Sequence, residues 1–221
     1  MAAAGRPAAP ALRITEIFHS IQGESSRVGL PTVFVRLTGC PLRCTWCDTA
    51  YAFSGGENLA LDDVLGRIAA FGCRTVCVTG GEPLAQKGCL PLLNALCDAG
   101  YAVSLETSGA LDIALADPRV VRIMDLKAPG SGEVERNLWS NLAALRGEDE
   151  VKIVLDSRED YDWAVATCRQ HALFDRCAVL FSPVQGRLEP ATLAEWILRD
   201  RLPVRFQLQL HKVLWGNRPG V

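Results

Sequence analysis

The sequence predicts an α/β protein with one domain, built as a partial, incomplete β/α barrel. Short apolar runs rich in β-branched residues alternate with longer amphipathic stretches, and polar motifs follow the ends of several runs. Strands that alternate with helices imply a parallel sheet covered on its outer face. About six such units are present in 221 residues, a length that suits one domain and a barrel that does not close.

The elements follow one another in the order that this fold requires. The apolar runs predict strands over residues 32–37, 75–79, 101–106, 120–126, 150–155, 178–182 and 205–209. The amphipathic stretches predict helices over residues 61–71, 90–99, 137–145, 160–171 and 191–199. Glycines support several boundaries: Gly72 and Gly100 each follow a predicted helix, as helix-ending residues do.

Composition narrows the classes of function. The Ala/Pro-rich residues 1–11 predict a disordered tail, which leaves residues 12–221 as the domain. The tail lacks the apolar segment of a signal peptide, and no apolar run of 18 residues predicts a membrane span. A net charge of −2 gives no sign of a nucleic-acid surface or a polybasic membrane anchor. We therefore expect no nucleic-acid partner and no membrane partner.

Three cysteines with the spacing C-x3-C-x2-C are the most informative motif: Cys40, Cys44 and Cys47. Thiolates are the normal ligands of iron–sulfur clusters, and a fully ligated four-iron cube takes four of them. No fourth cysteine lies beside the motif, so one iron of such a cube would remain open. An open iron can bind a small molecule directly, which predicts chemistry at a 4Fe–4S cluster.

Half of a zinc site is the alternative interpretation of the same cysteines, since zinc takes Cys and His in fours. Zinc pairs usually come with a second pair further along the chain. The other six cysteines form no such pair, and none of the three histidines lies near the motif in the sequence. These six are better interpreted as reduced thiols, and an oxygen-sensitive cluster favours a cytoplasmic location.

Two further motifs offer ligand groups directly after predicted structure. Gly80-Gly81-Glu82-Pro83 follows a strand, where glycines let the backbone approach a ligand and Glu82 can accept from an ammonium group. A strand-to-helix turn is the alternative. Asp48 and Thr49 follow the last cysteine, and the Thr49 oxygen suits Mg²⁺. A helix N-cap is the alternative for this pair.

Other candidates gather at strand ends, where the site of a β/α barrel lies. They are Glu106-Thr107-Ser108-Gly109, Asp125-Leu126-Lys127 and Ser182-Pro183-Val184-Gln185, with the polar turn Ile21-Gln22-Gly23-Glu24 nearer the N-terminus. Each alone is typical of turns or caps, and their common placement makes them site candidates. Arg36 lies in an apolar strand and needs a carboxylate partner, either on a ligand or in an internal ion pair.

Together these residues resemble the radical S-adenosylmethionine superfamily, whose signatures are the C-x3-C-x2-C loop and the GGEP turn. More closely, the chain resembles the 7-carboxy-7-deazaguanine synthase family of that superfamily. The matching strings are residues 16–18, 21–24, 34–37, 39–40, 44–49, 79–84, 106–109 and 209–212. The string Ile21-Gln22-Gly23-Glu24 discriminates best, because it precedes the motif shared by the whole superfamily.

The resemblance implies three cofactors: a 4Fe–4S cluster on Cys40, Cys44 and Cys47, S-adenosylmethionine, and Mg²⁺ on Thr49. It implies that S-adenosylmethionine contacts Trp46, Cys47, Asp48, Gly80, Gly81, Glu82, Gly109, Asp125, Leu126, Lys127, Ser182, Pro183, Val184 and Gln185. It implies that the substrate contacts Ile21, Gln22, Gly23, Arg36 and Thr107, with Arg36 on the substrate carboxylate. The roles of Glu24, Glu106 and the C-terminal tail stay open.

The resemblance also implies a reaction. A radical lyase of this family converts the pterin 6-carboxy-5,6,7,8-tetrahydropterin to 7-carboxy-7-deazaguanine, by ring contraction with loss of ammonia, in queuosine biosynthesis. An electron donor such as flavodoxin and a homodimeric assembly are implied with it. Two other functions compete: a glycyl-radical-activating enzyme, which shares the cysteine motif, and an iron–sulfur or zinc module for binding or electron transfer. The string at residues 21–24 and Arg36 favour the synthase.

Overall fold

The computed structural model describes residues 11–218, 220 and 221, so the predicted tail at residues 1–11 lies outside the described residues except for Ala11. The strands are β1 (Leu12–Ile21), β2 (Pro31–Leu37), β3 (Glu57–Leu59), β4 (Thr75–Gly80), β5 (Ala102–Thr107), β6 (Val121–Asp125), β7 (Glu150–Leu155), β8 (Ala178–Pro183) and β9 (Arg205–Phe206). The α-helices are α1 (Leu61–Ala69), α2 (Cys89–Asp98), α3 (Asn141–Ala144), α4 (Arg158–Gln170), α5 (Pro190–Asp200) and α6 (Leu210–Trp215).

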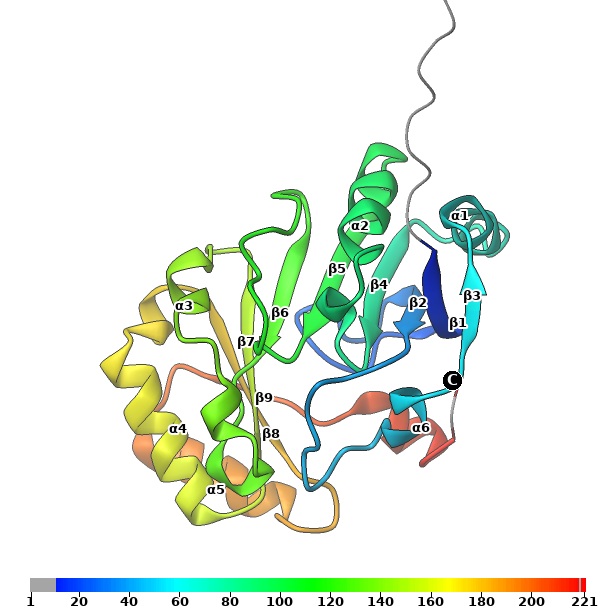
Figure 1. Ribbon diagram of the computed structural model, residues 1–221. Coiled ribbons are helices and arrows are strands. Elements are labelled where there is room, and N and C mark those ends of the chain that lie inside the picture. The colour runs from blue at the N-terminus through cyan, green and yellow to red at the C-terminus, as the bar shows by residue number, and fades with distance from the viewer. Residues whose placement is uncertain (1–10, 219) are drawn as a thin grey trace, which may run out of the picture.

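All described strands belong to one curved, open sheet (Figure 1). Its order is β3-β1-β2-β4-β5-β6-β7-β8-β9, and every pairing from β2 to β9 is parallel. Strands β1 and β3 join antiparallel at one edge. The prediction of an α/β fold with a partial barrel is therefore confirmed, and its parallel part places seven strand ends at one rim.

Helices cover the outer face because their apolar sides need the sheet. The α4 and α5 side chains, including Tyr161 and Leu193, pack with Val151 and Phe181 of β7 and β8 in one buried cluster. A second cluster joins α1 and α2 to the strands from β1 to β5. Figure 1 shows α4 and α5 outside β7 and β8, whereas the short α6 lies elsewhere, near the C-terminus. No described helix is both long and apolar enough to cross a membrane.

The elements predicted from the sequence differ from the structure near both edges of the sheet, at β1 and at β9. Residues 12–21 form the ten-residue strand β1, whose half-exposed positions give no clear alternation of apolar residues. In place of the helix expected over 137–145, the structure has only the four-residue helix α3. Its first residue is Asn141, whose side-chain amide donates hydrogen bonds to the backbone carbonyls of Gly109 and Leu111. The strand expected over 205–209 is only β9, and α6 follows it.

A buried ion cluster stabilises the rim of the sheet opposite the strand ends that carry the candidate motifs. Asp149 is fully buried just before β7. Its carboxylate accepts hydrogen bonds from the backbone N–H and the guanidinium of Arg122, at 2.9 and 3.1 Å, and from the Arg146 backbone N–H at 2.8 Å. Although burial raises the pKa of Asp149, Arg122 and Arg146 hold it below its usual value. The cluster joins β6 to β7.

We predict that Asp149→Ala lowers the free energy of unfolding by about 3–5 kcal/mol, because it leaves the buried Arg122 guanidinium without its counter-ion. Urea denaturation followed by circular dichroism measures this loss. Asp98→Ala is the control, since Asp98 pairs with Arg119 on the exposed surface, and it should cost far less. Equal losses for the two variants would contradict the structural role given to Asp149.

Candidate functional site

The rim formed by the ends of the parallel strands surrounds a cavity of about 740 Å³. Eighteen of the twenty-two residues that the resemblance assigned to a cofactor or to the substrate line it: Ile21, Gln22, Arg36, Cys40, Cys44, Trp46, Cys47, Asp48, Thr49, Gly80, Gly81, Thr107, Asp125, Lys127, Ser182, Pro183, Val184 and Gln185. Four more, Gly23, Glu82, Gly109 and Leu126, lie outside the lining. The barrel rule thus predicted the location, while the role of each residue stays a prediction.

The cysteine loop leaves the end of β2 and carries three free, partly exposed thiols into this cavity. Burial raises the pKa of Cys40 and of Cys44, and the nearby Lys127 ammonium opposes both shifts. Cys40, Cys44 and Cys47 are the only cysteines among the described residues that line the cavity. This donor set fits a cube held at three corners.

No three His, Cys, Asp or Glu side chains in the described part of the chain converge on a point that could hold a single metal ion. The case for a cluster at the cysteine loop therefore rests on its chemistry, namely three free thiols on one loop beside an open cavity.

The glycines of the GGEP turn let the cysteine loop pack directly on the end of β4. A Cβ on Gly81 would lie 2.7 Å from the Gly39 carbonyl carbon and 2.8 Å from the Cys40 Cβ, which is closer than real contacts allow. The backbone N–H of Gly81 donates to Leu37, and that of Glu82 donates to Gly39. Backbone contact between the two motifs therefore sets the position of Cys40.

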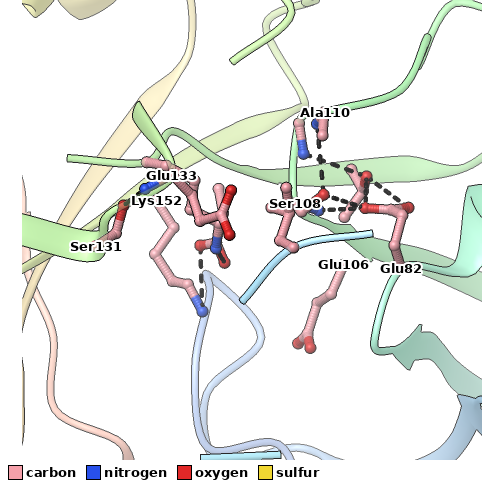
Figure 2. A network of polar contacts seen from close by, with 12 residues as sticks. Glu82, Glu106, Ser108, Ala110, Ser131, Glu133 and Lys152 are labelled. Carbon is pink, nitrogen blue, oxygen red and sulfur yellow. Dashed lines mark hydrogen bonds and ion pairs between the residues drawn. The ribbon is translucent and has the colours of Figure 1, made fainter. Parts of the chain in front are cut away.

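The Glu82 side chain has protein partners rather than free oxygens. Its buried carboxylate accepts from the Leu84 N–H at 2.9 Å, the Ser108 N–H at 2.6 Å and the Thr107 hydroxyl at 2.9 Å. Figure 2 shows Glu82 with Ser108 beside it in this network. The sequence suggested that Glu82 accepts from a ligand ammonium group, and in the structure this carboxylate already accepts from groups of the chain. These bonds connect the GGEP turn to the end of β5.

Gly109 and Leu126 also form the wall behind the lining. Gly109 has a φ of +73°, and a Cβ there would lie 2.7 Å from the Asp125 carbonyl oxygen. The Leu126 N–H donates to the Lys152 carbonyl, and its side chain is buried. Both residues therefore shape the ends of β5 and β6 through the backbone, and any contact with a cofactor would be made by their main chain.

Arg36 lines the cavity and also has an internal partner. Its Nε donates to the Glu16 carboxylate at 2.7 Å, across the register pair that joins β1 to β2. The Tyr51 hydroxyl donates to the same carboxylate oxygen at 2.8 Å. Although burial lowers the pKa of Arg36, Tyr51 and Glu16 raise it above its usual value, so Arg36 stays charged. The strand β1, missed in the sequence, thus supplies the ion-pair partner.

Asp48 and Thr49 lie between the cysteine loop and the C-terminal helix. Thr49 occupies the N-cap position of the 3-10 helix Ala50–Phe53, as the alternative interpretation expected, but its side chain makes no cap hydrogen bond. Its hydroxyl donates to Asp48 at 2.9 Å, and the other Asp48 oxygen accepts from Lys212 at 2.7 Å. Although partial desolvation opposes it, Lys212 strongly lowers the pKa of Asp48, whose side chain is 45% exposed. Hydroxyl and carboxylate oxygens are ligands that Mg²⁺ accepts.

Lys152 is a cavity residue that the sequence interpretation missed. It lies within the apolar strand β7, and a charge in such a run is the signal that could have revealed it. Its ammonium lies 2.7 Å from a Glu24 oxygen and 3.5 Å from Asp125 Oδ1. Lys127 pairs with the other Asp125 oxygen at 2.8 Å. Four largely buried charges of alternating sign, Lys127, Asp125, Lys152 and Glu24, therefore lie in a row along the cavity wall.

Glu106 lines the same wall and accepts from the Thr79 hydroxyl at 2.9 Å and from the Gln22 amide at 3.3 Å. Burial raises the pKa of Glu106, and Lys152 opposes the shift. In Figure 2, Lys152 and Glu106 extend to the same side of the strands. Glu106 gives the cavity a carboxyl group that is more easily protonated than one in water.

The C-terminal segment completes the cavity. His211 and Lys212 of α6 line it, as do residues 216–218, 220 and 221. The Leu210 N–H donates to the Gly23 carbonyl at 2.9 Å, and a Cβ on Gly23 would lie 3.0 Å from the His211 Cγ. Burial lowers the pKa of His211. Gly23 is therefore needed where the imidazole lies against the loop at residues 21–24.

Comparisons with known proteins agree with this geometry. Residues 34–125 match the model of the Radical SAM superfamily. A 7-carboxy-7-deazaguanine synthase of Chlorobaculum tepidum is 51% identical over 93% of this chain and 94% of its own length, and one of Koribacter versatilis is 41% identical over 92% and 97%. The crystal structure of QueE from Escherichia coli superimposes with a TM-score of 0.76 at 24% identity, covering 91% of this chain and 95% of that one.

We predict that Gly81→Ala reduces the iron and sulfide that the chain retains after anaerobic reconstitution. The added methyl group meets Gly39 and Cys40, and relieving this overlap costs about 1–3 kcal/mol and moves the first thiol. Iron and sulfide assays, with the ultraviolet–visible spectrum, measure the loss. Gly147→Ala is the matched control, because its Cβ would have nothing within 4 Å. Full iron content in Gly81→Ala would rule out the packing constraint.

Proposed function

Because the chain belongs to the 7-carboxy-7-deazaguanine synthase family of radical SAM enzymes, we propose that its cavity converts 6-carboxy-5,6,7,8-tetrahydropterin to 7-carboxy-7-deazaguanine. The observation that carries this proposal is one cavity lined by both the three thiols and Arg36. The reaction is a ring contraction with loss of ammonia. The relatives carry the synthase name, which disfavours both the glycyl-radical activase and the non-enzymatic metal module.

The cysteine loop would hold a 4Fe–4S cluster through Cys40, Cys44 and Cys47, leaving one iron for S-adenosylmethionine. Bound there, the cluster and S-adenosylmethionine would supply the radical chemistry needed to remove a hydrogen atom from the substrate. The chain's own part is to place that hydrogen and to exclude water. Trp46, the Gly80-Gly81 backbone and residues 182–185 would surround the S-adenosylmethionine, since they line the cavity beside the thiols.

The remaining lining suits a small, polar heterocycle with one carboxylate. Arg36 is held in place by Glu16 and stays charged, so it would bind the substrate carboxylate. Ile21 and Gln22 would contact the ring with Gly23 behind them, and Thr107 would contribute a hydroxyl. The lining offers both donors and acceptors, as recognition of a pterin edge requires.

Mg²⁺ would bind at Thr49, where a hydroxyl and the adjacent Asp48 carboxylate face the cavity. Held there, the ion would supply positive charge that helps to orient the substrate carboxylate. We further infer a cytoplasmic location, because nine free cysteines and an oxygen-sensitive cluster suit a reducing compartment. The homodimer and an electron donor such as flavodoxin stay predictions.

The decisive test is an anaerobic assay with reconstituted protein, reductant, S-adenosylmethionine, Mg²⁺ and 6-carboxytetrahydropterin. We expect mass spectrometry to detect 7-carboxy-7-deazaguanine, and we expect Cys44→Ala to abolish both the product and the cluster absorbance. Cys73→Ala is the control, because Cys73 lies outside the cavity. Release of 5′-deoxyadenosine without this product would contradict the proposed substrate.

We predict that Thr49→Val raises the Mg²⁺ concentration needed for half-maximal activity roughly tenfold or more, because it removes the oxygen ligand and keeps the side-chain shape. Activity titrated against Mg²⁺ measures the change. Thr49→Ser restores the hydroxyl and should restore the wild-type requirement. An unchanged Mg²⁺ requirement in Thr49→Val would place the ion elsewhere.

A further inference from the structure

Lys152 joins two walls of the cavity that otherwise belong to different parts of the chain. Glu24 ends the loop at residues 21–24, and Asp125 ends β6. The Lys152 ammonium lies between them, 2.7 Å from Glu24 and 3.5 Å from Asp125 Oδ1. The Lys152 side chain is 12% exposed and that of Glu24 is 10% exposed, so little solvent screens this pair.

The two acidic partners of Lys152 are not equally satisfied. The Glu24 oxygen is at hydrogen-bond distance from the ammonium, whereas Asp125 Oδ1 is buried without a hydrogen-bond partner among the described residues. The other Asp125 oxygen is already bonded to Lys127. A ligand that donates a hydrogen bond to Oδ1 would satisfy this oxygen and leave the Lys152 ammonium wholly to Glu24.

We propose that Lys152 is a positioning residue that couples the S-adenosylmethionine wall to the substrate loop. When S-adenosylmethionine binds at Asp125, the ammonium, already 2.7 Å from Glu24, is no longer shared with Asp125 and holds the loop at residues 21–24 more firmly. The Glu24 N–H donates to the Gln22 side chain, and the Gln22 amide donates to Glu106. Holding Glu24 in place therefore also restrains Gln22 and Glu106. The inference rests on the proposed function, which assigns these two walls to the two ligands.

Coupling of this kind is a free energy shared by two sites, and it is reciprocal. The first ligand should therefore tighten the binding of the second. Lys127 cannot provide the coupling, because its ammonium bonds Asp125 and makes no ion pair with Glu24. The contacts from Asp125 to Lys152 and from Lys152 to Glu24 physically connect the S-adenosylmethionine site with the substrate site.

The test uses hydrogen–deuterium exchange of the anaerobic holoenzyme with its cluster oxidised, so that no turnover occurs. In the wild type, S-adenosylmethionine alone should slow exchange in peptides that cover residues 21–30 by about fivefold or more. In Lys152→Met this protection should disappear, and Lys152→Arg should retain it. Lys87→Met is the matched control, because Lys87 is exposed and lies outside the cavity.

A second arm guards against misfolding of the single variant. Lys152→Met with Glu24→Gln removes both charges of the closest pair, so Glu24 is not left as a buried carboxylate without its partner, and Asp125 keeps Lys127. This double variant should fold, retain its cluster and still lack the protection. Wild-type protection in either variant, or none in the wild type, would overturn the proposal.

Calorimetry on the same oxidised holoenzyme separates this inference from the proposed function. We expect 6-carboxytetrahydropterin to raise the affinity for S-adenosylmethionine about fivefold in the wild type and to leave it unchanged in Lys152→Met. Equal increases in both would overturn the role of Lys152. If the pterin fails to bind while S-adenosylmethionine still protects residues 21–30 through Lys152, the proposed substrate is wrong and the positioning role stands.

Discussion

The contact between the GGEP turn and the cysteine loop is the constraint on which the site depends. Gly81 lets the Gly39 and Cys40 backbone approach so closely that no side chain fits between them. The Glu82 carboxylate then bonds Thr107 and Ser108, which fixes the turn to the next strand. A buried carboxylate with several donors is costly to disturb, because each donor would lose its partner in a place that water does not reach. The position of the Cys40 thiol is therefore fixed by contacts with the parallel sheet.

The rest of the cavity is organised by opposed charges. Arg36 pairs with Glu16, Lys127 and Lys152 share Asp125, and Lys212 pairs with Asp48. Each cation is thus held by a carboxylate while its side chain still lines the cavity. Such pairing keeps each charged side chain close to the position in which a charged molecule would meet it. The cavity is polar, and its lining carries six Lys or Arg side chains and four Asp or Glu side chains.

Sequence reasoning predicted the parallel sheet and most of the lining, because apolar runs locate strands and the barrel rule locates their polar ends. It failed where a residue's meaning depends on a distant partner. The ligand role of Glu82 stays a prediction, but its donors Thr107 and Ser108 at the end of β5 could not be inferred from spacing. Lys152 looked like one charge in a buried strand, and only the fold brings Glu24 to it. Strand β1 was not predicted, because most of its residues are partly exposed and its apolar and polar residues do not alternate clearly.

The last residues of the chain line the cavity but belong to neither buried cluster. The hydrophobic effect therefore stabilises the barrel without them, while the site depends on them for one of its walls. Their attachment is a few polar contacts, such as Lys212 with Asp48 and the Leu210 backbone with Gly23. An affinity tag fused after Val221 would begin inside the cavity lining, so a tag for purification belongs at the other end of the chain.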